Sequence, residues 1–138
     1  MKTYLFLDDM RVPSDCVNYM ATRFSDSAMY TRETWIVVKD YNEFVNYITQ
    51  KGLPDFISFD HDLADEHYDP SMYTNNYGDV AKNFKEKTGM DCAKWLVNYC
   101  LDNNKKLPNF VVHSMNPAGT KNIQSLLYEF KQFQNSEI

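Results

Sequence analysis

The sequence has few glycines, few basic residues and no long apolar run, and each shortage excludes a class of function. Only 4 of the 138 residues are glycine, and none forms a glycine-rich phosphate-binding loop. Lys and Arg number 14 against 19 Asp and Glu, which gives a net charge of −5. Such a chain is a poor candidate for sequence-independent binding to duplex nucleic acid. The longest apolar runs are four residues, as at 35–38, so no membrane span is expected.

Cysteine is also scarce, and its spacing excludes two common roles. None of the 3 cysteines has the paired spacing of a zinc site. Cys92 and Cys100 lie eight residues apart in an expected helix, which separates them by about 12 Å and is too far for a disulfide. We therefore expect reduced thiols in a cytoplasmic protein. The N-terminal apolar stretch is too short, and Asp8 and Asp9 make it too acidic, for a signal peptide.

The chain does contain enough apolar residues, 43%, for one core, and its length predicts a single domain over 1–138. Short apolar runs at 3–7, 35–38, 56–59 and 110–112 predict strands. Helices are expected after the capping residues Asp40, Thr88 and Asn116. Strands that alternate with helices predict an α/β fold with a mainly parallel sheet.

The last helix is expected to bury one apolar stripe, formed by Ile123, Leu126, Leu127, Phe130 and Phe133. Two stretches do not fit the alternation. Residues 13–34 have only a weak helical pattern and could equally form an irregular crossing. Residues 64–87 form an insertion without a clear period, for which two interpretations stay open: a lid over a site, or a surface excursion.

Polar clusters follow three of the four expected strands. They are Asp8, Asp9 and Arg11, then Asp60, His61 and Asp62, then His113, Ser114 and Asn116. Each cluster alone is more often a turn, a cap or a structural histidine. Together they favour a site, because ligands of open α/β sheets bind at the carboxyl ends of the strands. Crowded carboxylates repel one another, and a bound cation relieves that repulsion.

Five blocks in order resemble a known family: LFLDDMRVP, WIVVKDYNEF, GLPDFISFDHDL, TGMDCAKWLVNYC and FVVHSMNPAGTKNI. They are similar to the cyclic-phosphate processing receiver domains, which are relatives of the receiver domains of response regulators. The resemblance spans the chain apart from about 14–33 and 64–87. It implies a receiver-like, flavodoxin-type sheet in the order 2-1-3-4, flanked by helices. It also implies a role in processing cyclic phosphates of nucleotides or RNA ends.

The resemblance assigns roles at matching positions. Asp8 and Asp9 match the acidic pair that binds Mg²⁺ in receivers, Asp60 matches the phosphoacceptor, and Ser114 matches the hydroxyl residue. The lysine of the receiver's last strand has no evident counterpart, and Lys121 is at best a substitute. By contrast, His61, Asp62 and His113 are not receiver residues. They indicate catalysis rather than signalling.

The leading hypothesis is a phosphodiesterase that acts on a small-molecule or RNA-end cyclic phosphate. Mg²⁺ or Mn²⁺ would be held by Asp8, Asp9 and Asp60. His61 and His113 would act as acid and base, in an order that stays open, together with Asp60, Asp62 and Ser114. Phosphate oxygens would be bound by Arg11, Asn116 and Lys121. A metal-free mechanism with two histidines also stays open.

Two alternatives remain beside the enzyme. One is a non-catalytic receiver-like module that binds a phosphate or nucleotide, or accepts phosphate on Asp60. The other is an interaction protein whose polar strand ends are all structural. The sequence does not indicate an oligomeric state.

Overall fold

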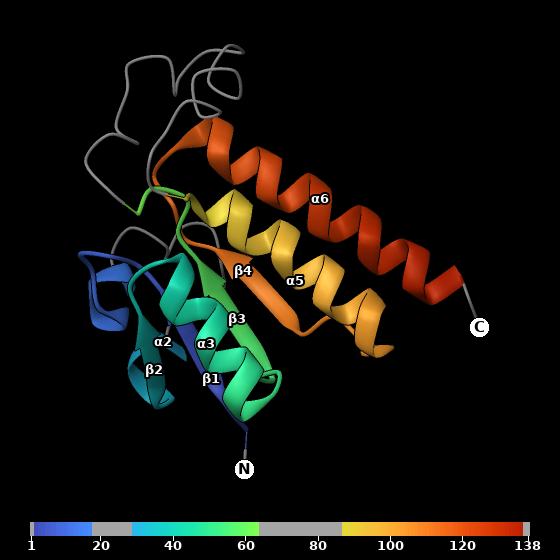
Figure 1. The fold of residues 1–138 in the computed structure, drawn as a ribbon. Helices are drawn as coiled ribbons and strands as arrows, with labels where there is room; N and C mark the ends of the chain where they lie inside the picture. The colour runs from blue at the N-terminus through green and yellow to red at the C-terminus, as the bar shows by residue number, and fades with distance from the viewer. Residues whose placement is uncertain (1, 18–28, 64–86, 137–138) are drawn as a thin grey trace.

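The computed structural model describes residues 2–17, 29–63 and 87–136 (Figure 1). Strands and helices alternate along the chain, as expected for an α/β fold. The elements are β1 (Tyr4–Leu7), the 3-10 helix η1 (Pro13–Asp15), α2 (Met29–Arg32), β2 (Trp35–Val38), α3 (Tyr41–Lys51), β3 (Phe56–Phe59), α5 (Gly89–Asn103), β4 (Asn109–Val112) and α6 (Pro117–Ser136).

The four strands form one parallel sheet in the order β2-β1-β3-β4, which confirms the expected receiver-like topology. β1 and β3 are the inner strands, and each is buried at three of its four positions. This burial on both sides explains why their sequences are nearly continuous apolar runs. All four strands run the same way, so their carboxyl ends meet at one edge.

Side-chain caps fix where two of the helices begin, at the residues that the sequence predicted. The Asp40 side chain accepts a hydrogen bond from the backbone N–H of Glu43, at the start of α3. Thr88 and Asp91 form a reciprocal capping box at the start of α5. Both contacts satisfy backbone donors that the first helical turn leaves without partners.

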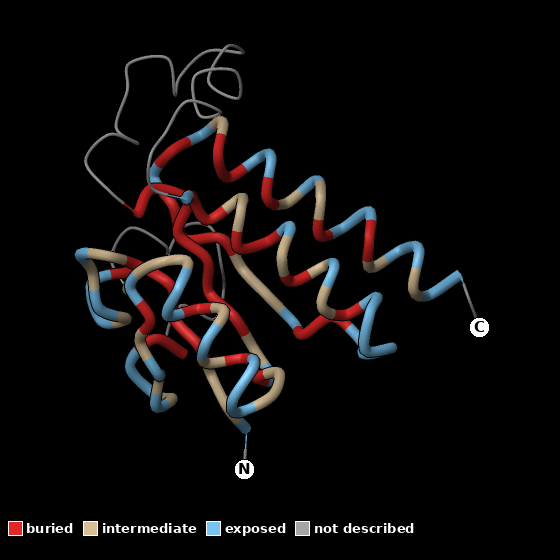
Figure 2. Tube along the Cα trace, in the orientation of Figure 1, coloured by how far each residue is buried: buried red, intermediate tan, exposed pale blue. Residues whose placement is uncertain are grey.

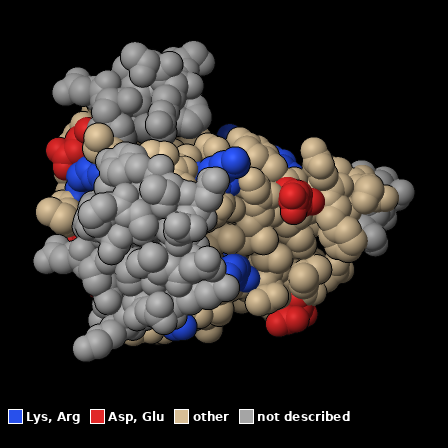
Figure 3. Space-filling view, turned by 90° about the horizontal axis from the view of Figure 1, so that it is seen from above, with Lys and Arg blue, Asp and Glu red and all other residues tan. Residues whose placement is uncertain are grey.

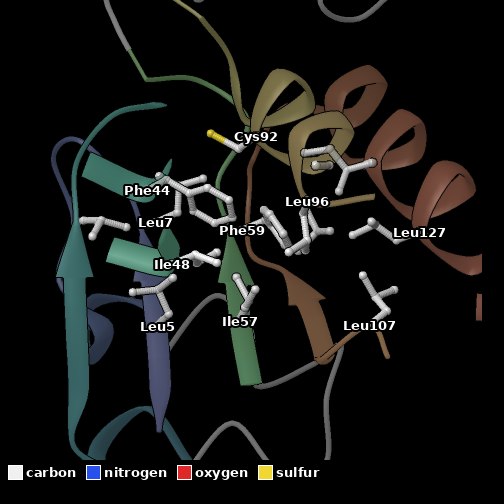
Figure 4. Close-up of a cluster of buried hydrophobic side chains, with 14 of the residues drawn as sticks. Leu5, Leu7, Phe44, Ile48, Ile57, Phe59, Cys92, Leu96, Leu107 and Leu127 are labelled. Atoms are coloured by element: carbon white, nitrogen blue, oxygen red, sulfur yellow. The ribbon is translucent and has the colours of Figure 1, made fainter. Parts of the chain in front are cut away.

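The larger core lies between the sheet and the helices α3, α5 and α6, which cover the same face (Figure 1). Figure 4 shows how its side chains meet: Leu5, Leu7, Ile57 and Phe59 of the sheet point toward Phe44, Ile48, Leu96 and Leu127 of the helices. Figure 2 shows buried positions along the inner strands and at intervals along these helices. All three cysteines are buried free thiols, as expected.

A smaller cluster covers the opposite face of the sheet. Phe6 packs there with Cys16, Met29 and Tyr30, and Trp35 lies against them. Because side chains alternate along a strand, Phe6 points to this face while its neighbours Leu5 and Leu7 point to the other. The stretch that had a weak helical pattern thus contributes η1 and the short helix α2, while residues 18–28 lie outside the described part.

One position of the expected apolar stripe of α6 is wrong. Ile123, Leu127 and Phe130 are buried and Leu126 is half-buried, but Phe133 is 49% exposed. Helical periodicity places Phe133 on the correct side of the helix. However, α6 extends beyond β4 toward its C-terminal end (Figure 1), so the sheet no longer covers this position.

Candidate functional site

The ends of three neighbouring strands lie level at one edge of the sheet. The register pairs Leu7 of β1 with Phe59 of β3. One residue further, the backbone N–H of Asp60 donates to the carbonyl of Leu7 at 2.9 Å, and the N–H of His113 donates to the carbonyl of Phe59 at 2.8 Å. The sheet therefore brings Asp8, Asp60 and His113 to the same edge.

These three side chains also share one face of the sheet. Asp8 and Asp60 come two residues after Phe6 and Ser58, so they point to the same side as the smaller core. Asp8, Asp60 and His113 each provide one potential ligand atom, and these atoms lie within 4.8 Å of one another. No more than 1% of any of the three is exposed. We call this set the carboxylate–histidine cluster.

Asp8 is held as a carboxylate by the groups around it. Its Oδ1 accepts hydrogen bonds from the backbone N–H of Met10 and of Arg11, both at 2.9 Å. Its Oδ2 lies 3.0 Å from Nε2 of His113 and 3.2 Å from Nε of Arg11. Burial alone would favour the neutral acid, but the hydrogen bonds outweigh it, and the pKa of Asp8 lies below its usual value.

Asp60 has the opposite electrostatic character. Burial, reinforced by the nearby negative charge of Asp8, raises its pKa to about 8, and the Arg11 guanidinium only partly offsets this. Oδ1 accepts a hydrogen bond from the backbone N–H of His61 at 2.8 Å. The buried Oδ2 accepts no hydrogen bond from the residues that the structure describes, and Nη2 of Arg11 lies 3.8 Å away. Among the residues that the structure describes, the two buried carboxyl groups thus share the guanidinium of Arg11.

His113 is bound through both ring nitrogens. Nε2 faces Asp8, and Nδ1 lies 2.7 Å from Oγ of Ser58. The ring stacks on Phe6 with centroids 4.4 Å apart and planes at 5°. Burial lowers the pKa of His113, and the Asp8 carboxylate offsets only part of this effect. On balance, its surroundings favour the neutral imidazole.

The carboxylate–histidine cluster has the composition of a divalent-metal site. Mg²⁺ and Mn²⁺ prefer carboxylate oxygens, which Asp8 and Asp60 supply. The buried Oδ2 of Asp60, which accepts no hydrogen bond from a described residue, is an available ligand atom. A cation here would also lower the repulsion between Asp8 and Asp60. The residues therefore fit the metal that receiver-like sites imply.

A second polar cluster lies beside the first. Nδ1 of His61 lies 2.9 Å from Oδ1 of Asp62, and the Asn116 amide donates to the same oxygen at 3.0 Å. The side-chain oxygen of Asn116 accepts from the backbone N–H of Gly119 at 2.9 Å, which confirms Asn116 as the cap of α6. All three residues are at least 98% buried. The hydrogen bond from the backbone N–H of His61 to Oδ1 of Asp60 joins the two clusters.

The remaining predicted site residues lie around these clusters. Asp9 and Arg11 are half-buried. Oγ of buried Ser114 accepts from the backbone N–H of Asn116 at 3.0 Å. Lys121 is an exposed residue of α6. Apart from Lys87, the expected insertion at 64–87 lies outside the described residues, so its role as a lid stays a prediction.

Two residues of the site were not predicted from the sequence. Oγ of Ser58 lies 2.9 Å from the hydroxyl oxygen of Tyr30, and both side chains are buried. Ser58 is the only polar residue in the strand FISF and lies two residues before Asp60. That spacing puts it on the same face as Asp60 and could have identified it. Tyr30 has no comparable signal, because the surrounding sequence lacks a clear periodicity.

Figure 3 views the molecule from above, and on the visible surface of the described residues the basic and acidic side chains are interspersed. Among the helices that the structure describes, none combines the length and hydropathy needed to cross a bilayer.

Comparison with known proteins agrees with the fold. The family model of the cyclic-phosphate processing receiver domain matches residues 3–129, nearly the whole chain. No curated protein matches the chain, and no solved structure does. The matched region contains all four strands and both polar clusters. The chain belongs to the cyclic-phosphate processing receiver domain family.

Proposed function

We propose that this chain hydrolyses a cyclic phosphodiester of a nucleotide or an RNA end. The observation that carries the proposal is the buried cluster of two carboxyl groups and a histidine at the carboxyl edge of the sheet. Membership of a family named for cyclic-phosphate processing supports this substrate class. A purely structural cluster would not need a second buried carboxyl group whose pKa is raised to about 8.

The reaction requires one proton acceptor and one proton donor. Water adds to phosphorus and loses a proton, one ring P–O bond breaks, and the leaving oxygen takes up a proton to give a monoester with a free hydroxyl group. His113 is suited to donate in its protonated, imidazolium form, which the Asp8 carboxylate beside Nε2 stabilises. His61 is suited to accept, because donation from Nδ1 to Asp62 leaves a lone pair on Nε2.

The charges around the cluster suit a phosphoryl group. Arg11 already reaches both Asp8 and Asp60, and its guanidinium can bind non-bridging phosphate oxygens. Mg²⁺ or Mn²⁺ held by Asp8, Asp9 and Asp60 would supply further positive charge that polarises the phosphoryl group. Ser114 would contribute a hydroxyl group at the end of β4. In this proposal, phosphate oxygens would also be bound at the start of α6, by Asn116 and Lys121.

The test is monoester release from a panel of substrates. The panel contains a nucleoside 2′,3′-cyclic phosphate, a nucleoside 3′,5′-cyclic phosphate and an oligoribonucleotide with a 2′,3′-cyclic end, each with Mg²⁺, Mn²⁺ or EDTA. We expect turnover of at least one of them, and a loss of at least about a hundredfold in Asp60→Asn. Asp102→Asn, the same change at an exposed residue of α5, is the matched control. Absence of turnover across the panel contradicts the proposal.

The second candidate function is phosphate acceptance on Asp60. It is favoured by the position of Asp60 after an inner strand and by its Oδ2, which no described residue hydrogen-bonds. Against it, the sheet of the described residues has four strands, and no further strand supplies a receiver-type lysine. Incubation with acetyl phosphate separates the candidates. Stable labelling that is lost in Asp60→Asn, without turnover of cyclic phosphates, favours the acceptor.

A further inference from the structure

A chain of hydrogen bonds runs from the smaller core to the carboxylate–histidine cluster. The hydroxyl oxygen of Tyr30 lies 2.9 Å from Oγ of Ser58, which lies 2.7 Å from Nδ1 of His113. Nε2 of His113 lies 3.0 Å from Oδ2 of Asp8. Each of the four side chains is at most 2% exposed. These hydrogen bonds therefore connect α2, β3 and the ends of β4 and β1 through buried groups.

The groups at the two ends of this series of hydrogen bonds determine which atom donates in each of them. A carboxylate can only accept, so the hydrogen between Asp8 and His113 is on Nε2. A neutral imidazole with its hydrogen on Nε2 has a lone pair on Nδ1, so the Ser58 hydroxyl donates to it. The Ser58 oxygen then accepts from the Tyr30 hydroxyl, because the one hydroxyl hydrogen of Ser58 is already directed at His113. Burial raises the pKa of Tyr30 and so keeps this hydroxyl protonated. Each hydrogen bond between these four side chains thus has one defined donor and one defined acceptor.

The same contacts fix the plane of the imidazole ring. Hydrogen bonds at both nitrogens define its rotation, because a flip would place carbon atoms opposite Ser58 and Asp8. Phe6 stacks against one side of the ring, with planes at 5°. Tyr30 in turn packs against Trp35, with ring centroids 5.4 Å apart. The smaller core therefore holds the two hydroxyl groups in place.

We infer that Ser58 and Tyr30 are positioning residues that hold His113 as the tautomer with its proton on Nε2, directed at Asp8. His113 then presents a donor, and not a base, to the cluster. The inference rests on the proposed function only for its consequence for catalysis, where it fixes the plane of the His113 ring and the direction of Nε2. The geometry itself is independent of any substrate.

The first test is the tautomer of His113 in the metal-free protein with EDTA. Long-range proton–nitrogen NMR on a sample with ¹⁵N-labelled histidine distinguishes a proton on Nε2 from one on Nδ1. We expect a single His113 signal set with the proton on Nε2. A proton on Nδ1, or exchange between the two tautomers, overturns the inference whether or not the protein turns over a substrate.

The second test separates positioning from simple packing. Ser58→Ala removes the donor to Nδ1, and Tyr30→Phe removes only the oxygen that fixes the Ser58 hydroxyl. We expect Ser58→Ala to shift the Nδ1 resonance and Tyr30→Phe to shift it less, while the conservative variant Ser58→Thr keeps it near the wild-type position. Unchanged Nδ1 resonances in folded Ser58→Ala overturn the positioning role.

Kinetics on the best substrate of the panel completes this test. The expected loss of kcat in Ser58→Ala is about tenfold, the factor that one ordinary hydrogen bond supplies, with KM changed less than about twofold. Ser58→Thr is expected to recover most of it. If the tautomer is as expected but no panel member is hydrolysed, the proposed function fails and the inference on His113 stands. If kcat is unchanged in Ser58→Ala, the positioning role is wrong.

Discussion

Asp60 loses contact with solvent in the folded chain, and this changes how its carboxyl group titrates. Its pKa is raised to about 8 by burial and by the charge of Asp8, whereas an unfolded aspartate titrates near pH 3.9. Between these values the folded chain holds one proton more than the unfolded chain. The contribution of Asp60 to stability is therefore fully present below about pH 4 and is lost as the pH rises toward 8.

Asp60→Asn removes this pH dependence, and urea unfolding in EDTA measures it. We expect the free energy of unfolding of the wild type to fall relative to the variant between pH 5 and pH 8. The slope is at most about 1.4 kcal/mol per pH unit, since one proton is involved. His113 keeps its own opposite contribution in both proteins, so it largely cancels. The exposed substitution Asp102→Asn is expected to show no such trend, and a flat difference for Asp60→Asn contradicts the buried acid.

The sequence identified the cluster residues but not their support. Asp8, Asp60 and His113 each come directly after an apolar strand, and parallel strands end at one edge, so their meeting was predictable. The contact of His113 with Ser58 depends on which residues face each other across the sheet, and the contact of Ser58 with Tyr30 depends on a four-residue helix. Local periodicity contains neither piece of information. The position of His61 against α6 likewise depends on how closely a helix approaches the sheet.

At the scale of elements, the approach of α6 to the second polar cluster depends on Gly119. A Cβ atom at this position would lie 2.3 Å from Cγ of His61, closer than any normal contact. The start of α6 therefore reaches His61 and Asp62 only because residue 119 has no side chain. Gly89 has the same relation to Asp60, where a Cβ would lie 1.8 Å from the backbone oxygen.

Gly119→Ala tests this packing. Alanine favours a helix by about 1 kcal/mol, but overpacking costs about 1–3 kcal/mol, and the rigid imidazole base cannot move aside. We expect a net loss of stability in chemical denaturation and a shift of the His61 ring resonances. Ser125→Ala, at an exposed position of the same helix, is the matched control and should be neutral or stabilising. A Gly119→Ala variant as stable as this control means that α6 packs less closely.

The elements themselves were largely predictable, because their signals are local. Strand runs, the caps at Asp40 and Thr88 and the opening of α6 at Asn116 all lie where the sequence placed them. Phe133 was placed wrongly, because periodicity gives the side of a helix but not where the sheet beneath it ends. Residues 13–34 gave no definite pattern, and the described part contains only two very short helices there.

At the scale of the whole molecule, the carboxylate–histidine cluster should couple metal binding to stability. A ligand that binds only the folded state at ten times its Kd adds about 1.4 kcal/mol, or about 5 °C in Tm for a chain of this size. We expect such a rise with millimolar Mg²⁺ or Mn²⁺ relative to EDTA. It should be larger at pH 8 than at pH 6, because the ion must displace the proton of Asp60.

Differential scanning fluorimetry across this pH range measures the effect. Asp60→Asn is expected to abolish the rise in Tm, while Asp102→Asn retains it. An unchanged Tm in the wild type contradicts the metal assignment and favours the metal-free mechanism, in which Arg11 supplies the positive charge.

The most direct test of the proposed hydrolysis is the turnover of the best cyclic phosphate by His113→Gln. Glutamine can keep a hydrogen bond to Asp8 or to Ser58, but an amide cannot exchange a proton near neutral pH. The assay is run well below the Tm of both proteins, with circular dichroism as the folding control. Asp102→Asn, at an exposed residue of α5, is the control. We expect His113→Gln to fold and to lose at least about a hundredfold in kcat, while Asp102→Asn stays near wild type. Full turnover by folded His113→Gln would contradict the proposed role of the cluster in catalysis.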